Sequence, residues 1–179
     1  MKKSFNRLDV LFMLASLVHI ILGIVVICFC GEEFEKNNYF VGGVLTVSAL
    51  PSLLIFLSSN GFKHFRKVPY LVSSVIALVI GIVFVCCEEL TPAHLFLFVG
   101  IFDICRGIFE SIDAALEFKE NKLEIIEIFA GLGDVLFGIL LCIKLENGYK
   151  NHLIFMGVAL ILVGIKFAVD LILDLKRPQ

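Results

Sequence analysis

The stretch LDVLFMLASLVHIILGIVVICFC, residues 8–30, holds the pattern that decides the fold of this 179-residue chain. Within this almost wholly apolar block, Ala15, His19 and Gly23 recur four residues apart and therefore share one face of a helix. At about 1.5 Å per residue, a helix of this length crosses the roughly 30 Å hydrocarbon core of a bilayer. The stretch predicts a membrane-spanning helix that carries a stripe of small side chains.

The same pattern recurs twice further along the chain. The equivalent triplets are Ser73, Ala77 and Gly81, and then Ala130, Asp134 and Gly138. A second series, Gly43, Gly100 and Gly157, recurs every 57 residues; Gly107 and Gly164 follow seven residues later, with Leu50 in the first copy. The period predicts three tandem helical hairpins, at about residues 8–62, 69–119 and 124–175. Small residues let helices approach closely in lipid, so eight glycines are predicted to pack helices: Gly23, Gly43, Gly81, Gly100, Gly107, Gly138, Gly157 and Gly164.

Six apolar blocks, residues 8–30, 39–57, 69–87, 91–113, 125–143 and 152–173, are separated by short polar links. In lipid only helices and closed barrels satisfy their own backbone polar groups, and these blocks lack the alternation of barrel strands. The predicted fold is an all-α membrane protein, with residues 1–179 forming one integral membrane domain. Its six transmembrane helices form three tandem hairpins in a pseudo-threefold arrangement about the membrane normal.

Composition and charge narrow the class of protein. Hydrophobic residues make up 59% of the chain and charged residues 18%, and the mean hydropathy of +0.99 excludes a water-soluble domain. The net charge of -2 leaves no basic surplus for nucleic acid, so the expected partner is the lipid bilayer. A homo-oligomer and an unidentified small-molecule substrate stay open.

The distribution of basic residues predicts the orientation. Ten Lys and Arg residues lie in the segments on the side of the two termini: Lys2, Lys3, Arg7, Lys63, Arg66, Lys67, Lys119, Lys122, Lys176 and Arg177. Three lie on the other side: Lys36, Lys144 and Lys150. Both termini are therefore expected to face the cytoplasm. The first block is too long for a signal-peptide core and lacks a small-residue cleavage site, so we interpret it as a retained span.

Ionisable residues inside the spans are the candidate functional residues, because each is costly in lipid unless it is paired or hydrated. They are His19, Asp103, Arg106, Asp134 and Lys166, with Asp170 four residues after Lys166 on the same helix face. One hypothesis is a buried network in which Arg106 pairs with Asp103 and Asp134 and docks the second hairpin on the third. The alternative is a proton or ion relay through Asp134, Asp103 and His19, because His19 and Asp134 occupy the same position of the repeat.

Structural interpretations are favoured for the remaining polar residues, over a metal or substrate site for the carboxylates and a redox or soft-metal cluster for the cysteines. Carboxylates at the inner ends of the even spans are interpreted as a solvated rim: Glu110, Asp113, Glu117, Asp170 and Asp174. Cysteines near the outer ends of the odd spans are interpreted as small buried apolar residues: Cys28, Cys30, Cys86, Cys87 and Cys142. His94 and His152 are repeat equivalents expected to anchor at the membrane interface, with acid sensing at the periplasmic face as the alternative. The usual catalytic signatures are absent from the sequence, so no catalytic residue, metal site or cofactor is predicted.

Tandem two-helix units with mid-span glycines, and charges at the inner ends of the even helices, resemble the HdeD family over about residues 9–174. The resemblance implies a bacterial inner-membrane protein of a family with unknown function, whose namesake is linked to acid resistance. We therefore expect a non-enzymatic, multi-pass protein of the cytoplasmic membrane with a structural or acid-stress role. The alternative is a small proton- or ion-coupled transporter or channel that uses the mid-membrane charges.

Overall fold

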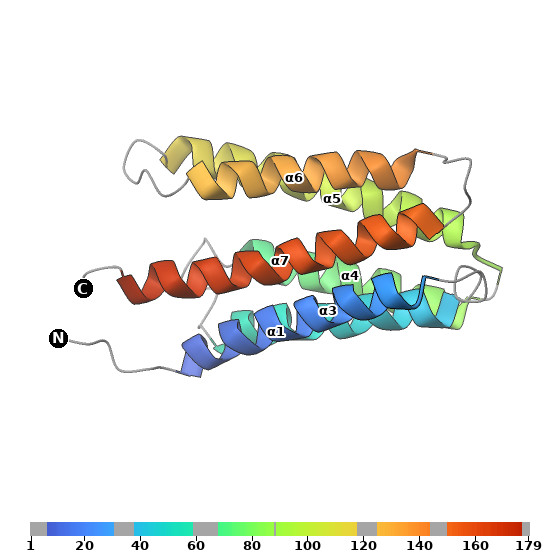
Figure 1. Ribbon diagram of the computed structural model, residues 1–179, viewed down its shortest axis with the longest axis horizontal. Coiled ribbons are helices and arrows are strands. Elements are labelled where there is room, and N and C mark those ends of the chain that lie inside the picture. Colours follow the sequence, from blue (N-terminus) through green and yellow to red (C-terminus); the bar gives the residue numbers. More distant parts are fainter. Residues whose placement is uncertain are drawn as a thin grey trace.

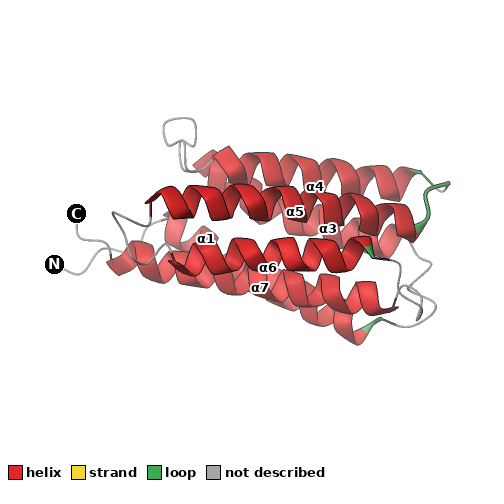
Figure 2. Cartoon of the chain, turned by 90° about the horizontal axis from the view of Figure 1, so that it is seen from above, coloured by secondary structure: helices red, strands yellow, loops and turns green. Residues whose placement is uncertain are grey.

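The computed structural model describes residues 7–30, 38–58, 68–87, 89–117, 125–143 and 150–176, and these residues form six α-helices. The helices are α1 (Arg7–Cys28), α3 (Asn38–Ser58), α4 (Val68–Cys86), α5 (Pro92–Glu117), α6 (Ile125–Cys142) and α7 (Lys150–Lys176). All six run along the long axis of one bundle (Figures 1 and 2). Figure 1 shows that α1 begins and α7 ends at the same end, which we call the terminal end; the opposite end is the distal end.

The six helices coincide with the six predicted apolar blocks to within a few residues, and the all-α fold class is confirmed. Four helical segments are long and apolar enough to cross a membrane: Arg7–Cys28, Tyr39–Ser58, Ile125–Cys142 and Lys150–Val169. In α4, the corresponding apolar segment is shorter, Leu71–Cys86. In α5, the apolar sequence contains Asp103, Arg106 and Glu110. The chain is therefore an all-α membrane protein.

The tightest helix pairs do not lie within the predicted hairpins. They are α1 with α7, α3 with α4, and α5 with α6, and each joins helices of two different repeats. Contacts between the two helices of one hairpin are fewer, and fewest between α4 and α5. Because the first helix pairs with the last, the three tight pairs and the weaker contacts within the hairpins join the six helices into a ring.

Glycines set the close approach in each tight pair. A Cβ atom at Gly42 would lie 2.8 Å from the carbonyl oxygen of Gly81, although an ordinary contact begins near 3.4 Å. The corresponding distance from Gly100 to the Gly138 oxygen is 2.7 Å, and from Gly157 to the Gly23 oxygen 2.8 Å. Any larger residue at these positions would force the two backbones apart, which is how small residues act in membrane helix packing.

A second crossing of the same kind lies nearer the terminal end in two of the pairs. A Cβ atom at Gly131 of α6 would lie 2.7 Å from the carbonyl oxygen of Gly107 on α5. In the α1/α7 pair, a Cβ atom at Gly164 would lie 2.8 Å from the carbonyl oxygen of Ser16. Gly131 and Ser16 were not among the predicted packing residues, although they occupy the same position of the repeat.

The prediction was wrong for one glycine. Nothing lies within 4 Å of a Cβ atom placed at Gly43, whereas its neighbour Gly42 forms the contact with Gly81. The even helix of the first repeat is therefore offset by one residue from the predicted alignment. The same offset makes Ala49, which is buried, the counterpart of Gly107, while the predicted counterpart Leu50 is 45% exposed.

Apolar side chains fill the distal half of the bundle and also cover its outside. All six helices contribute to the distal core: Val26, Val41, Phe84, Leu95, Leu141 and Leu153 are among its buried members. Exposed apolar side chains follow the outer faces along the length of the helices, as Met13, Leu17, Ile21 and Ile24 do on α1. An apolar outer face of this extent is unfavourable in water and suits contact with lipid.

Candidate functional site

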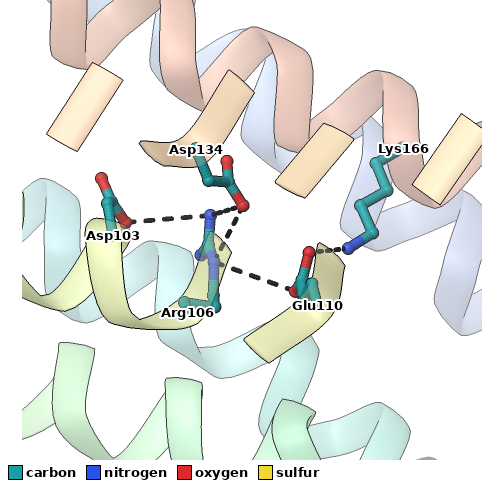
Figure 3. A network of polar contacts seen from close by, with 5 residues as sticks. All are labelled: Asp103, Arg106, Glu110, Asp134 and Lys166. Atoms are coloured by element: carbon teal, nitrogen blue, oxygen red, sulfur yellow. Dashed lines mark hydrogen bonds and ion pairs between the residues drawn. The ribbon is translucent and has the colours of Figure 1, made fainter. Parts of the chain in front are cut away.

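The candidate site begins on one face of α5. Asp103, Arg106 and Glu110 are spaced by three and four residues, so their side chains point to the same side of the helix. The opposite face exposes Ile101 and Ile108. Figure 3 shows that the three charged side chains point toward α6 and α7. Asp103 and Arg106 lie near the middle of a helix that runs from Pro92 to Glu117.

Arg106 lies at the centre of the contacts (Figure 3). Its Nη2 atom lies 2.7 Å from Oδ2 of Asp134 on α6, and its Nε donates a hydrogen bond to the same oxygen at 3.1 Å. Two longer ion pairs stay on α5: Nη2 lies 3.8 Å from Oδ1 of Asp103, and Nε lies 3.9 Å from Oε1 of Glu110. Charge-assisted bonds at the shorter distances are the strong ones, so Asp134 is the principal partner of Arg106.

Lys166 extends these contacts to a third helix. Its Nζ donates a hydrogen bond to Oε2 of Glu110, which joins α7 to α5. We call Asp103, Arg106, Glu110, Asp134 and Lys166 the charge network. The exposed fraction of its side chains ranges only from 13% for Asp103 to 21% for Lys166. The charge network therefore ties together three helices from two repeats, mostly out of contact with the surroundings.

The structure gathers four of the predicted residues, Asp103, Arg106, Asp134 and Lys166, and adds one that was assigned elsewhere. Glu110 was placed in a solvated rim, but it lies in the charge network. The missed signal was its spacing, four residues after Arg106 on the same face. Asp170 lies on α7, but its side chain is outside the described residues, as are those of Asp113, Glu117 and Asp174.

His19 makes no hydrogen bond or ion pair with the charge network among the described residues. Its Nδ1 is 2.8 Å from the carbonyl oxygen of Ala15, and its ring centroid is 5.2 Å from that of Phe167 on α7. The side chain is buried, with 4% exposed. No hydrogen bond or ion pair joins His19 to Asp134 in the described part of the chain, so the direct meeting expected for a relay is not observed.

His94 and His152, which are equivalent in the repeat, lie in different surroundings. His94 is exposed at the start of α5, where its Nδ1 accepts a hydrogen bond from the backbone N–H of Thr91 at 3.2 Å. His152 is buried, with its Nε2 2.9 Å from the carbonyl oxygen of Ile143 and its ring stacked on Phe96 at 5.1 Å. Thus His94 helps to cap a helix, and His152 links the starts of α5 and α7 to the end of α6.

The cysteines are not the buried residues that the sequence predicted. Cys28, Cys86, Cys87 and Cys105 are exposed, and Cys30 and Cys142 are half-buried. All six thiols are free. The outer faces of the helices are themselves apolar, so a cysteine there needs no burial in the protein. Among the described residues, no three His, Cys, Asp or Glu side chains converge as metal ligands would.

Comparison with known proteins gives one family. No curated protein and no solved structure matches the chain. The family described as a short repeat of unknown function, DUF308, matches residues 14–86 and again residues 72–143. The two matches begin 58 residues apart, which agrees with the period of the glycines, and together they span more than half of the chain. The chain therefore belongs to the DUF308 family, the family that includes HdeD.

Proposed function

We propose that this protein is a non-enzymatic, six-span protein of a bacterial cytoplasmic membrane in which the charge network holds the helix ring in one register. The observation that carries the proposal is the pairing of Arg106 with Asp134 across α5 and α6 at 2.7 Å. An arginine at this depth is costly in lipid, and a carboxylate that accepts two of its bonds supplies the compensation. Removing one partner of such a pair leaves the other charge buried without compensation.

The distribution of apolar side chains supports six spans rather than four. Helix α5 directs its charges inward and exposes Ile101, Ile108 and Ile112 on its outer face. Helix α4 likewise exposes Val72 and Val79. Both helices therefore present lipid with an apolar surface, although their sequences are shorter or more charged than those of the other four. The excess of Lys and Arg on the side of the termini supports a cytoplasmic terminal end.

The structural role predicts how charge changes at the pair affect stability. Arg106→Gln and Asp134→Asn should each destabilise the protein by about 3 kcal/mol, because each breaks the partly buried ion pair that joins α5 to α6. The double variant should be more stable than the sum of the two losses implies. Thermal unfolding in detergent, followed by circular dichroism, measures this coupling. Strictly additive losses would show that the pair does not hold the helices.

Membership in the HdeD-containing family, rather than any contact in the bundle, supports a role in acid stress. The test is survival of cells at acidic pH after deletion of the gene, with complementation by the wild type or by Arg106→Gln. Restoration by the wild type alone would join the acid role to the charge network. Equal survival with and without the gene would argue against the role.

Proton- or ion-coupled transport is the competing proposal, and the partial exposure of the charge network is the observation in its favour. The absence of a hydrogen bond or ion pair between His19 and Asp134 among the described residues counts against a three-residue relay. The two functions separate in liposomes that contain the purified protein and a pH-sensitive dye. Proton flux that is lost in Asp134→Asn would support transport, whereas no flux from the wild type would support the structural role.

A further inference from the structure

The charge network is not electrically balanced. Three carboxylates, on Asp103, Glu110 and Asp134, face two cations, on Arg106 and Lys166. The helices around them offer little further charge. Neither Asn38–Ser58 nor Val68–Cys86 contains an Asp, Glu, Lys, Arg or His residue, and α6 carries Glu127 two turns from Asp134. Helix α1 contributes the buried His19 and, in its first turn, Arg7 and the buried Asp9. The side chain of Asp170 on α7 is outside the described residues. When all five groups of the network are charged, one negative charge is left over.

The geometry assigns the uncompensated charge to Asp103. Asp134 receives two bonds from Arg106, at 2.7 and 3.1 Å, and Glu110 receives the bond from Lys166. Asp103 has a single ion-pair contact, at 3.8 Å, which is beyond hydrogen-bond range. Its residue surface is nine-tenths buried, with 9% exposed, and its carboxylate points toward the network (Figure 3). A buried carboxylate without a hydrogen bond is an unfavourable state that a bound cation relieves.

Helix packing does not require this charge. The repeat period of 57 residues relates α5 to α7, and it aligns Asp103, Arg106 and Glu110 with Leu160, Val163 and Phe167. On α7 these apolar side chains belong to the core, and the α1/α7 pair uses the same glycine crossings as the α5/α6 pair. At the position of Asp134, α1 carries His19, whose ring lies against Phe167, the counterpart of Glu110. The α1/α7 crossing is therefore packed with apolar residues at the positions where α5 carries charges. Helix packing thus does not explain the surplus carboxylate on α5.

We propose that the carboxylate of Asp103 is the binding site for one exchangeable monovalent cation, a proton or an alkali-metal ion. Binding makes the network neutral: two carboxylates remain paired with Arg106 and Lys166, and the third holds the bound cation. This site goes beyond the structural role proposed above. Two ion pairs are enough to hold the helices in register, and they do not require the third carboxylate. It also does not require transport, since binding without passage through the membrane satisfies it.

Linkage between cation binding and folding tests the proposal. The purified full-length protein in detergent is unfolded thermally in two series: pH is varied at constant salt, and NaCl or KCl is varied at constant pH and ionic strength, with choline chloride as the replacement. A single cation that binds only the folded protein lowers the unfolding equilibrium constant by up to tenfold for each tenfold rise in its concentration. The series in which the response depends on Asp103 identifies the cation as a proton or an alkali-metal ion.

Two substitutions at the site and one outside it complete the experiment. Asp103→Asn keeps the Arg106–Asp134 pair and should reduce the dependence in one of the two series by the contribution of one cation, up to tenfold in the unfolding equilibrium constant for each tenfold change in its concentration. Asp103→Leu introduces the residue type of Leu160, which occupies the equivalent position on α7. If the asparagine variant does not fold, the leucine variant provides the same measurement of stability. Glu127→Gln changes a carboxyl group of α6 outside the network and should keep the wild-type dependence.

The proposal is overturned if neither series changes the stability of the wild type, or if the Asp103 variants respond as the wild type does. Loss of the dependence in Glu127→Gln to the same extent would also overturn it, because the effect would then not belong to Asp103. These outcomes are independent of proton flux and of the coupling between Arg106 and Asp134. The binding site can therefore fail while the proposed structural function stands, and the reverse also holds.

Discussion

Two neighbouring glycines on α3 should respond in opposite ways to the same added methyl group. In Gly42→Ala the new Cβ would lie 2.8 Å from the carbonyl oxygen of Gly81 and 3.1 Å from Cγ2 of Val85. An ordinary contact of 3.4 Å requires α3 and α4 to separate by about 0.6 Å, and such overpacking costs ~1–3 kcal/mol. In Gly43→Ala nothing lies within 4 Å of the new atom.

Both variants gain the same helix propensity, about 1 kcal/mol for a glycine replaced by alanine inside a helix. The difference between them therefore isolates the packing cost, and Gly42→Ala should be less stable than Gly43→Ala by ~1–3 kcal/mol. For a chain of this size this corresponds to roughly 2–4 °C in melting temperature for each kcal/mol. Circular dichroism of the helices in detergent measures it, which suits a chain without tryptophan.

A second pair on α6 repeats the experiment: Gly131→Ala meets the carbonyl oxygen of Gly107 at 2.7 Å, while Gly133→Ala meets nothing within 4 Å. Equal melting temperatures within each pair, or a lower one for Gly43→Ala than for Gly42→Ala, would refute the packing argument. The period of the repeat alone predicts that Gly43 is the sensitive position, so the experiment also decides between the two alignments.

Three further predictions test other contacts. Lys166→Met and Glu110→Gln should each lower the free energy of unfolding by ~3 kcal/mol, and the double variant should recover much of the loss, as a double-mutant cycle would show. In intact cells that express single-cysteine variants, a membrane-impermeant maleimide should label Cys87, which follows α4 at the distal end. It should leave Cys105 unlabelled, because this side chain faces lipid; the reverse pattern would contradict the topology. Phe167→Ala should cost ~3–5 kcal/mol in thermal unfolding, because it removes a large buried ring from the terminal half of the core, and a loss under 1 kcal/mol would show that the site collapses.

Helix positions were predictable from the sequence because length and apolarity carry the signal for a membrane helix. The identity of a single packing residue was harder. Gly42 and Gly43 are adjacent, and a period near 57 residues accommodates either one. Only the contact with Gly81 distinguishes them, because one residue along a helix turns the side chain by about 100° and moves it off the crossing face.

The assignment of Glu110 failed because the end of its helix was misplaced. The apolar block was predicted to end at residue 113, which put Glu110 at the rim, but α5 continues to Glu117. The carboxylate therefore lies seven residues before the end of the helix, within reach of Lys166 on α7. The cysteines show a different limit, since average burial of a residue type describes soluble proteins, whereas the outer face of this bundle is itself apolar.

The pairing of helices has a consequence for how the fold is completed. Each stripe of small residues can face only one neighbour, and here it faces a helix of an adjacent repeat rather than its own hairpin partner. A single hairpin therefore has no tight pair. The helices of the α3/α4 and α5/α6 pairs are consecutive in the chain. The α1/α7 pair instead brings Gly23 against Gly157, 134 residues later in the chain. The α1/α7 contact thus requires both ends of the chain, and so does the apolar cluster of Ala15, Ile55 and Phe167, which joins α1, α3 and α7.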